Sequence, residues 1–261
     1  QVQPVSHSRD GNSRGQNSMT TFYGQYGQDS IIDAFFQQQG TAPGFYVDIG
    51  ASDGIRFSNT YFLASMRKWH DICVEVHPDY YKLLAVNRDS AINYRCAVGD
   101  KDEGMVPIRL NYRASLTSLD LSLDDKFARE YEGYYAPREV EQVNGFANGI
   151  TEVPVRTIDS ILEENAHSFT SGIDVFCIDI DGSEKFAFPG FTLSKWKPRI
   201  LLLEHTAVGH EVVDSFARKA GYIKCKTLGS DNFYVLTLAD ADAISRIEPS
   251  KELKKVPHPA G

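Results

Sequence analysis

Short apolar stretches alternate with longer segments of helical periodicity along most of this chain. The apolar stretches predict strands, and they lie at residues 45–49, 71–76, 92–98, 173–180 and 199–205. The periodic segments predict helices, and they lie at residues 59–69, 78–88, 157–164 and 208–220. In the last of these helices we expect Val212, Val213, Phe216 and Ala220 to share the buried face. Because strand and helix alternate, we predict crossovers between parallel strands.

The final apolar stretches favour a different connection. YIKCKT and NFYVLTL are separated by LGSD, which is typical of a hairpin turn between antiparallel strands. The fold class is therefore predicted to be α/β, with a mostly parallel, doubly wound sheet and an antiparallel edge strand.

The chain divides into one domain and two terminal segments. Residues 1–20 are polar and lack an apolar signal core, so we interpret them as a disordered leader or the remnant of a tag. Residues 21–240 are predicted to form a single domain, and residues 241–261 a charged tail. Residues 111–150 interrupt the alternation and are interpreted as an inserted lid or substrate region. The aromatic residues in this insertion argue against complete disorder, and they are Tyr131, Tyr134, Tyr135 and Phe146.

Composition excludes several classes of partner. The formal net charge is −8, and no dense Lys/Arg cluster is present, so we expect no nucleic-acid binding. No apolar run approaches the roughly 20 residues of a membrane span. The four cysteines lie in apolar or alternating runs without a C-x-x-C pair, which indicates reduced thiols and a cytoplasmic location. An oligomer remains possible.

The stretch FYVDIGASDG, residues 45–54, is the first candidate binding site. It places Asp48 and Gly50 at the carboxyl end of a predicted strand, where doubly wound sheets bind ligands. The G-x-G-x-x-G fingerprint is absent, and Asp48 and Asp53 would repel a pyrophosphate. Glu75 ends the next strand, where a carboxylate can accept two hydrogen bonds from a ribose diol. S-adenosylmethionine has a ribose, a positive sulfonium and no phosphate, and it matches this acidic loop.

A set of motifs in sequence order resembles the FkbM family of S-adenosylmethionine-dependent methyltransferases. The resemblance covers about residues 23–238 and rests on GQYGQD (24–29), FYVDIGASDG (45–54), SNTYFL (58–63), VEVHPDYY (74–81), NR (87–88), CAVGD (96–100), TIDSIL (157–162), IDIDGSE (178–184) and ILLLEH (200–205). It implies the Rossmann-like class I methyltransferase fold with the last strand antiparallel. It also implies O-methylation of a hydroxyl on a sugar, glycan or natural product, which would be the small-molecule or glycan partner.

The resemblance also implies a set of cofactor-binding residues. Glu75 would hold the ribose, and Asp48, Gly50 and Asp53 would line the methionine end of the cofactor. The full set of expected cofactor-binding residues is Asp48, Gly50, Ala51, Ser52, Asp53, Asn59, Thr60, Glu75, Val76, Ala97 and Asp179. Two positions depart from the family pattern. Ser52 stands where the family usually has Asn, and Glu75-Val76-His77-Pro78 stands where it usually has Glu-Pro-Asn-Pro.

A second acidic group follows the later strands. Asp179 and Asp181 are two residues apart at a strand end, and Glu204 and His205 end the neighbouring strand. Methyl transfer to a hydroxyl requires a base or a metal that lowers the pKa of that hydroxyl. His205 could be the base. Alternatively, Asp179, Asp181 and Glu204 could hold a divalent cation such as Mg, Mn or Ca. The predicted catalytic residues are therefore Asp179, Asp181 and His205.

Two alternative functions stay open at this point. IDIDGS also resembles the signature of haloacid dehalogenase-type phosphatases, in which Asp179 would be the nucleophile and Asp181 the acid/base. That motif normally opens its domain, whereas here it lies deep in the chain. The chain could also be a non-catalytic binding module with a methyltransferase fold, in which case it would bind the cofactor without turnover.

Overall fold

The computed structural model describes residues 21–40, 43–112, 117 and 140–259. Its main element is a seven-stranded sheet with the order β10-β11-β9-β8-β1-β2-β3. These strands are β1 Phe45–Ile49, β2 His70–Val74, β3 Ile92–Tyr94, β8 Val175–Ile178, β9 Ile200–Glu204, β10 Ile223–Leu228 and β11 Asp231–Val235. The expected leader, residues 1–20, lies outside the described residues.

The sheet is parallel except at one strand. The pairs β1–β2, β2–β3, β1–β8 and β8–β9 are parallel, and β11 pairs antiparallel with both β9 and β10. The expected hairpin and mostly parallel sheet are confirmed. The antiparallel strand lies one position in from the edge, because β10 forms the edge and β11 folds back between it and β9.

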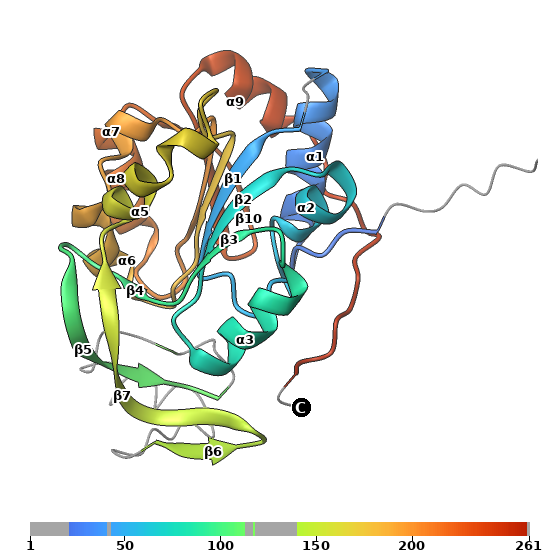
Figure 1. Ribbon diagram of the computed structural model, residues 1–261. Coiled ribbons are helices and arrows are strands. Elements are labelled where there is room, and N and C mark those ends of the chain that lie inside the picture. The colour runs from blue at the N-terminus through green and yellow to red at the C-terminus, as the bar shows by residue number, and fades with distance from the viewer. Residues whose placement is uncertain (1–20, 41–42, 113–116, 118–139, 260–261) are drawn as a thin grey trace, which may run out of the picture.

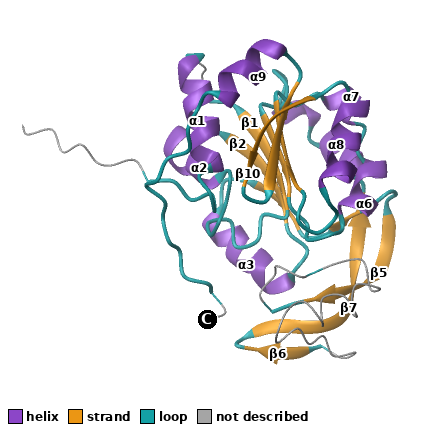
Figure 2. Ribbon diagram, turned by 180° about the vertical axis from the view of Figure 1, so that it is seen from behind, coloured by secondary structure: helices purple, strands orange, loops and turns teal. Residues whose placement is uncertain are grey.

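Helices cover both faces of this sheet, so the domain has three layers (Figures 1 and 2). One face packs against α1 Gln28–Gln38, α2 Tyr61–Arg67, α3 Pro78–Asn87 and α9 Leu238–Ser245. The other face packs against α5 Ile158–Glu164, α6 Glu184–Ala187, α7 Leu193–Trp196 and α8 His210–Lys219. Strand β1 is buried on both faces: Val47 belongs to one core and Tyr46 to the other.

One detail of the helix prediction is wrong. In α8, Val213 and Ala217 are completely buried, and Phe216 and Ala220 pack against the same core. Val212 is instead 40% exposed, because its neighbour Val213 already occupies the inward position of this turn.

A second, smaller sheet lies below the main sheet in Figure 1. It contains β4 Ala97–Val98, β5 Glu103–Leu110, β6 Glu141–Val143 and β7 Phe146–Arg156, with β7 at its centre. Its own small core consists of Ala97, Ile108, Leu110, Ala147, Val153 and Val155. The predicted strand at 92–98 is therefore wrong: it is two strands. The chain leaves the main sheet after Tyr94, and Ala97 pairs with Val155 in the second sheet.

Two of the expected domain boundaries fall inside elements of the structure. Residue 150 lies within β7, and residue 240 lies within α9. Most of the proposed insertion, including Tyr131, Tyr134 and Tyr135, falls outside the described residues. After α9 the chain returns to the start of the domain, where the Phe22 amide donates to the Glu252 carbonyl at 3.0 Å.

Two further observations concern the cysteines and the lengths of the helices. All four cysteines are free, and Cys73, Cys96 and Cys177 are buried in the two large cores. Within the described residues, no helix combines the length and the apolar character that a bilayer crossing requires.

Candidate functional site

The carboxyl ends of the central strands open into a cavity of about 440 Å³. The chain proceeds from β1 outward to β2 and β3 on one side, and from β8 to β9 on the other. The order of the strands therefore reverses between β1 and β8, which is where open α/β sheets bind ligands. A volume of this size is typical of small-molecule sites.

Gly50 lets the first loop pass very close to the end of β8. Its φ is +93°, and its amide donates to the Val74 carbonyl of β2 at 2.9 Å. A Cβ atom at this position would lie 1.7 Å from the Asp179 carbonyl oxygen. Only glycine fits both the backbone conformation and the close approach. The loop that follows is thereby directed across the cavity.

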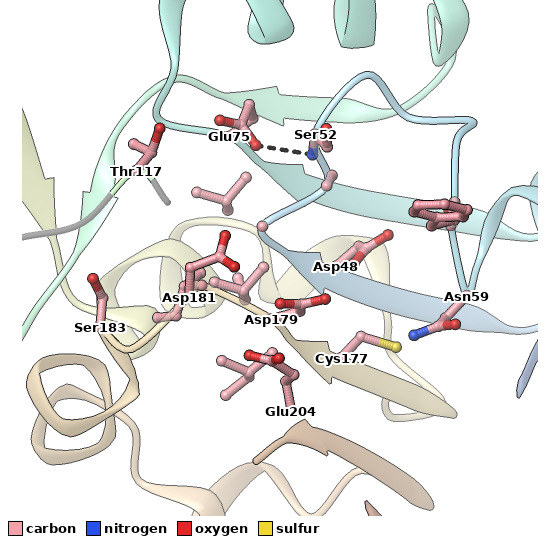
Figure 3. Close-up of a pocket in the computed structure, with 18 of the residues that line it drawn as sticks. Asp48, Ser52, Asn59, Glu75, Thr117, Cys177, Asp179, Asp181, Ser183 and Glu204 are labelled. Atoms are coloured by element: carbon pink, nitrogen blue, oxygen red, sulfur yellow. Dashed lines mark hydrogen bonds between the residues drawn. The ribbon is translucent and has the colours of Figure 1, made fainter. Parts of the chain in front are cut away.

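Glu75 presents a carboxylate to the cavity just after β2. Its Oε2 accepts from the Ser52 amide at 2.8 Å, which Figure 3 shows, and its Oε1 accepts from the His77 amide at 2.7 Å. Burial raises the pKa of Glu75 to about 7, and the hydrogen bonds from backbone amides oppose this rise. Each oxygen keeps further acceptor capacity, so a diol could bind to a carboxylate that is already oriented.

Asp48 lies beneath the same loop at the end of β1. Its Oδ2 accepts from the Thr60 hydroxyl at 2.6 Å, and Arg88 donates to that hydroxyl at 3.1 Å. Burial raises the pKa of Asp48, and the bond from Thr60 opposes this effect. Asp48 therefore lines the cavity, whereas Thr60 lies outside the cavity lining and orients the Asp48 carboxylate.

Asn59 is an unsatisfied polar side chain in the cavity wall. It immediately precedes Thr60, the N-cap residue of α2. Its Oδ1 is buried and has no hydrogen-bond partner among the described residues. Figure 3 shows its side chain beside Asp48 and Cys177. A buried acceptor without a partner is costly, so this oxygen is suited to a donor supplied by a ligand.

Three of the predicted site residues do not line the cavity: Asp53, Thr60 and His205. Oδ1 of Asp53 accepts from both the Ile55 and the Arg56 amide, at 2.9 and 2.8 Å, so Asp53 shapes the loop, and it does not line the cavity. The remaining predicted residues do line it, and they are Asp48, Gly50, Ala51, Ser52, Asn59, Glu75, Val76, Ala97, Asp179, Asp181 and Glu204.

His205 turns away from the cavity because Glu204 turns toward it. Neighbouring residues of an extended chain point to opposite faces. The ring of His205 stacks on His210 at 3.6 Å between centroids, and its buried Nε2 has no partner in the described part of the chain. Burial lowers the pKa of His205, and the neighbouring His210 lowers it further.

Three carboxylates converge where β8 and β9 end. One oxygen from each of Asp179, Asp181 and Glu204 lies within 4.8 Å of the others. Figure 3 shows the three side chains approaching one another from two adjacent strands. Glu204 is only 8% exposed, and its Oε2 has no hydrogen-bond partner among the described residues. These oxygens are the hard ligands that Mg²⁺, Mn²⁺ and Ca²⁺ prefer, so the residues present fit such a cation.

The convergence of these acids has a strong electrostatic effect. Burial raises the pKa of Asp179 well above its ordinary value, and the neighbouring Glu204 and Asp181 raise it further. Burial, followed by the neighbouring charge of Glu184, raises the pKa of Glu204 to about 7. Asp179 is exposed to the cavity, although it lies deep within the protein. The cluster therefore favours the uptake of either protons or a cation.

Sequence reasoning missed part of the cavity wall. Ile108 and Thr117 line it from the second sheet and the residues beyond it, and Gln28 and Asp231 line it from α1 and β11. The Gln28 amide donates to the Asp231 carboxylate at 2.5 Å. The GQYGQD motif was the available signal for Gln28. Ile108 and Thr117 had none, because the second sheet was not recognised.

One family model matches the chain, and several solved structures are similar to it. The Methyltransferase FkbM domain family matches residues 48–224, which is more than half of the chain. No curated protein sequence matches the chain. Among solved structures, the FkbM methyltransferase from Methylobacillus flagellatus is 15% identical, with a TM-score of 0.41. The similarity covers 74% of this chain and 43% of that one, so this chain spans less than half of its length.

A second similar structure is a TehB-like SAM-dependent methyltransferase from Corynebacterium glutamicum. It is 11% identical, with a TM-score of 0.37, and the similarity covers 81% of this chain and 85% of that one. The fold is an α/β fold with a mostly parallel central sheet. The chain belongs to the FkbM methyltransferase family.

Proposed function

We propose that this protein is an S-adenosylmethionine-dependent O-methyltransferase that acts on a hydroxyl of a sugar, glycan or natural product. The observation that carries the proposal is Glu75, an oriented carboxylate that faces the cavity beside the Gly50 loop. This arrangement suits a ribose diol and offers no phosphate site.

The charge of the cavity wall supports this donor. Among the described residues, six carboxylates line the cavity, and they are Asp48, Glu75, Asp179, Asp181, Glu204 and Asp231. Arg56 is the one basic side chain in that described lining. A sulfonium and an ammonium group are attracted by such a surface, whereas a phosphate is repelled. In this arrangement Glu75 would hold the ribose, Asn59 and Asp48 would face the methionine amine, and Val76 and Ala97 would contact the adenine.

The same charge argues against a phosphatase of the haloacid dehalogenase type. That chemistry pairs its two aspartates with a downstream lysine, and no lysine lines the described cavity wall. Membership of the FkbM family also points to methyl transfer. A protein that releases phosphate from a model ester and ignores S-adenosylmethionine would reverse this conclusion.

The acceptor hydroxyl would approach Asp179, Asp181 and Glu204. Burial raises the pKa of Glu204 to about 7, so this carboxylate is partly ionised near neutral pH and can take up the proton of the hydroxyl. The three residues would alternatively hold a divalent cation, which supplies a Lewis acid that lowers the pKa of a bound hydroxyl. We favour the cation, because the unpartnered Oε2 of Glu204 would then coordinate it.

The polar part of the cavity lining supports a polyhydroxylated acceptor. Besides the carboxylates, amide and hydroxyl side chains line the cavity, and they include Gln25, Gln28, Ser183, Thr206 and Ser230. Such groups both donate and accept hydrogen bonds, as sugar hydroxyls do. The cytoplasmic location expected from the reduced cysteines stays a prediction, as does an oligomer.

The catalytic proposal is tested by the formation of S-adenosylhomocysteine from S-adenosylmethionine in the presence of a panel of sugars, polyols and phenols. We expect turnover with at least one hydroxyl acceptor, and we expect Asp179→Asn to lower it at least about 100-fold. Tight binding of the cofactor without turnover on any acceptor would instead identify a non-catalytic binding module.

The cation is tested separately by thermal unfolding with Mg²⁺, Mn²⁺ or Ca²⁺. Ligand binding to the native state raises the melting temperature, and chelation reverses the rise. We expect the effect in the wild type and in Glu211→Gln, an exposed glutamate on α8, and its loss in Glu204→Gln. Equal shifts in all three proteins would contradict a site at Glu204.

A further inference from the structure

His77 connects the two sheets at the edge of the cavity. It follows Glu75 by two residues and is the N-cap of α3. Its side chain is completely buried, and its amide donates to Glu75 Oε1 at 2.7 Å. Its Nε2 lies 2.8 Å from the Ala147 carbonyl oxygen of β7. One residue therefore contacts both the carboxylate beside the cavity and the second sheet.

The first turn of α3 satisfies both backbone groups of Ala147. The Asp79 carboxylate accepts from the Ala147 amide at 2.8 Å, while His77 bonds to the carbonyl. Ala147 lies opposite Gln142 of β6, beyond the end of the β5–β7 pairing at Gly149. The two side chains thus take the place of a strand at this edge of β7.

The contacts define the tautomer of His77. Nδ1 accepts from the Asp79 amide at 3.2 Å, so it carries no proton. Nε2 must then donate to the Ala147 carbonyl. The ring is neutral, and both of its nitrogens are used. We call His77, Asp79 and Ala147 the α3–β7 joint.

Residues on both sides of the joint line the cavity. Glu75 and Val76 precede α3, while Ala97 and Ile108 belong to the second sheet. The distance between these two walls depends on how the second sheet is held against α3. Tyr80 adds to the joint from the same turn, since its ring packs on Phe146 with centroids 4.8 Å apart.

We propose that His77 is a positioning residue that fixes the second sheet against Glu75 and thereby sets the affinity for the nucleoside part of the cofactor. This inference rests on the proposed cofactor site. It assigns to His77 no contact with the ligand. Its effect passes through two hydrogen bonds: the ring of His77 bonds to the Ala147 carbonyl, and its backbone amide bonds to the Glu75 carboxylate.

Two substitutions separate the two ring bonds. An asparagine places an acceptor near the position of Nδ1 but is too short to reach Ala147, whereas a glutamine places a donor near the position of Nε2. His77→Asn should therefore keep the helix cap and lose the joint. His77→Gln should restore the bond to Ala147. Thr237→Val is the matched control, because it removes an N-cap from α9, far from the cavity.

The experiment combines calorimetry with S-adenosylhomocysteine and hydrogen exchange of residues 146–156. We expect His77→Asn to bind about tenfold more weakly and to exchange faster in this segment. We expect His77→Gln to recover most of both properties, and Thr237→Val to change only the melting temperature. Wild-type affinity and exchange in His77→Asn would overturn the inference, as would a loss of stability without a loss of affinity.

Two further outcomes are informative. If His77→Asn does not fold, Asp79→Ala opens the other half of the joint, and it must weaken binding in the same way for the inference to stand. If the wild type does not bind S-adenosylhomocysteine, the proposed function fails. Hydrogen exchange of the variants would then still show whether His77 holds β7 against α3.

Discussion

At the scale of single residues, the cavity depends on groups whose hydrogen bonds are already made before a ligand arrives. Glu75 accepts hydrogen bonds from two backbone amides, and Asp48 accepts one from the Thr60 hydroxyl. Such bonds fix the orientation of a buried carboxylate, so its remaining lone pairs point in defined directions. Asn59 differs, since its Oδ1 has no partner in the described chain. This oxygen would gain a partner from a bound donor.

Gly50 is the residue on which the shape of the loop depends most. We predict that Gly50→Ala lowers the free energy of unfolding by at least about 2 kcal/mol, because the new Cβ meets the Asp179 carbonyl. Gly172→Ala is the control: its φ is also positive, but nothing lies within 4 Å of the added Cβ, so about 1 kcal/mol is expected. Urea unfolding of both variants measures the difference, and equal losses would contradict the steric argument.

The sequence identifies the strand-end residues of the site but not the direction of every side chain. Asp48, Gly50, Glu75 and Asp179 were predictable because each lies at or just beyond the carboxyl end of an apolar strand, and these ends face the ligand side. Asp53 was not, since only the folded loop shows that its carboxylate accepts the Ile55 and Arg56 amides. For His205 the alternation of side chains along a strand was the available signal, because its neighbour Glu204 faces the cavity.

At the scale of elements, local patterns define the helices and strands of the main sheet within a few residues. The strand at 45–49 follows from its apolar run. The helix that begins at Pro78 has proline in its first turn, and the helix that begins at Ile158 is capped by Thr157. The division of residues 92–98 could not be predicted. Ala97 and Val98 pair with β7, nearly 60 residues later, and no local signal indicates such a partner.

The buried histidine of α3 makes stability depend on pH. Burial is the main reason why the pKa of His77 lies below the 6.5 of an ordinary histidine. At this residue the unfolded chain therefore binds more protons than the folded one as the pH falls below 6.5, so His77 contributes a loss of stability there. The contribution of His77 is fully present above pH 6.5 and is lost as the pH falls through its folded pKa.

This dependence is measured by urea unfolding of the wild type and His77→Gln between pH 7.5 and 5. We expect the wild type to lose more stability than the variant, by up to about 1.4 kcal/mol for each pH unit below 6.5. The comparison with the variant is necessary because buried acids such as Asp29, with a pKa of about 6, contribute with the opposite sign. A constant difference between the two proteins would contradict a neutral, buried His77.

At the scale of the whole molecule, an acidic cavity lies at the point where the strand order reverses, and residues of both sheets line it. The main sheet supplies the carboxylates, and the second sheet supplies Ala97, Val98 and Ile108 to the apolar part of the wall. The alternation of strand and helix predicted the main sheet. The second sheet could not be recognised because β4 and β5 precede the proposed insertion, whereas their partner β7 begins inside it and ends beyond it.

A ligand that binds across this cavity should stabilise the whole domain. At a concentration of S-adenosylhomocysteine 100 times its dissociation constant, we expect a gain of about 2.7 kcal/mol in the free energy of unfolding. Thermal unfolding with increasing ligand measures this gain as a rising melting temperature. ATP, which carries the same adenosine but also a triphosphate, serves as the control, and an equal stabilisation by ATP would contradict the acidic site.

The central claim is that Glu75 binds the ribose of S-adenosylmethionine. The most direct test is calorimetry with S-adenosylhomocysteine on the wild type, Glu75→Ala and Glu211→Ala, the last being an exposed control on α8. We predict that Glu75→Ala loses about 1–3 kcal/mol of binding free energy, which is roughly a fivefold to 150-fold weaker affinity, while the control is unchanged. Equal affinity in all three proteins would contradict the claim.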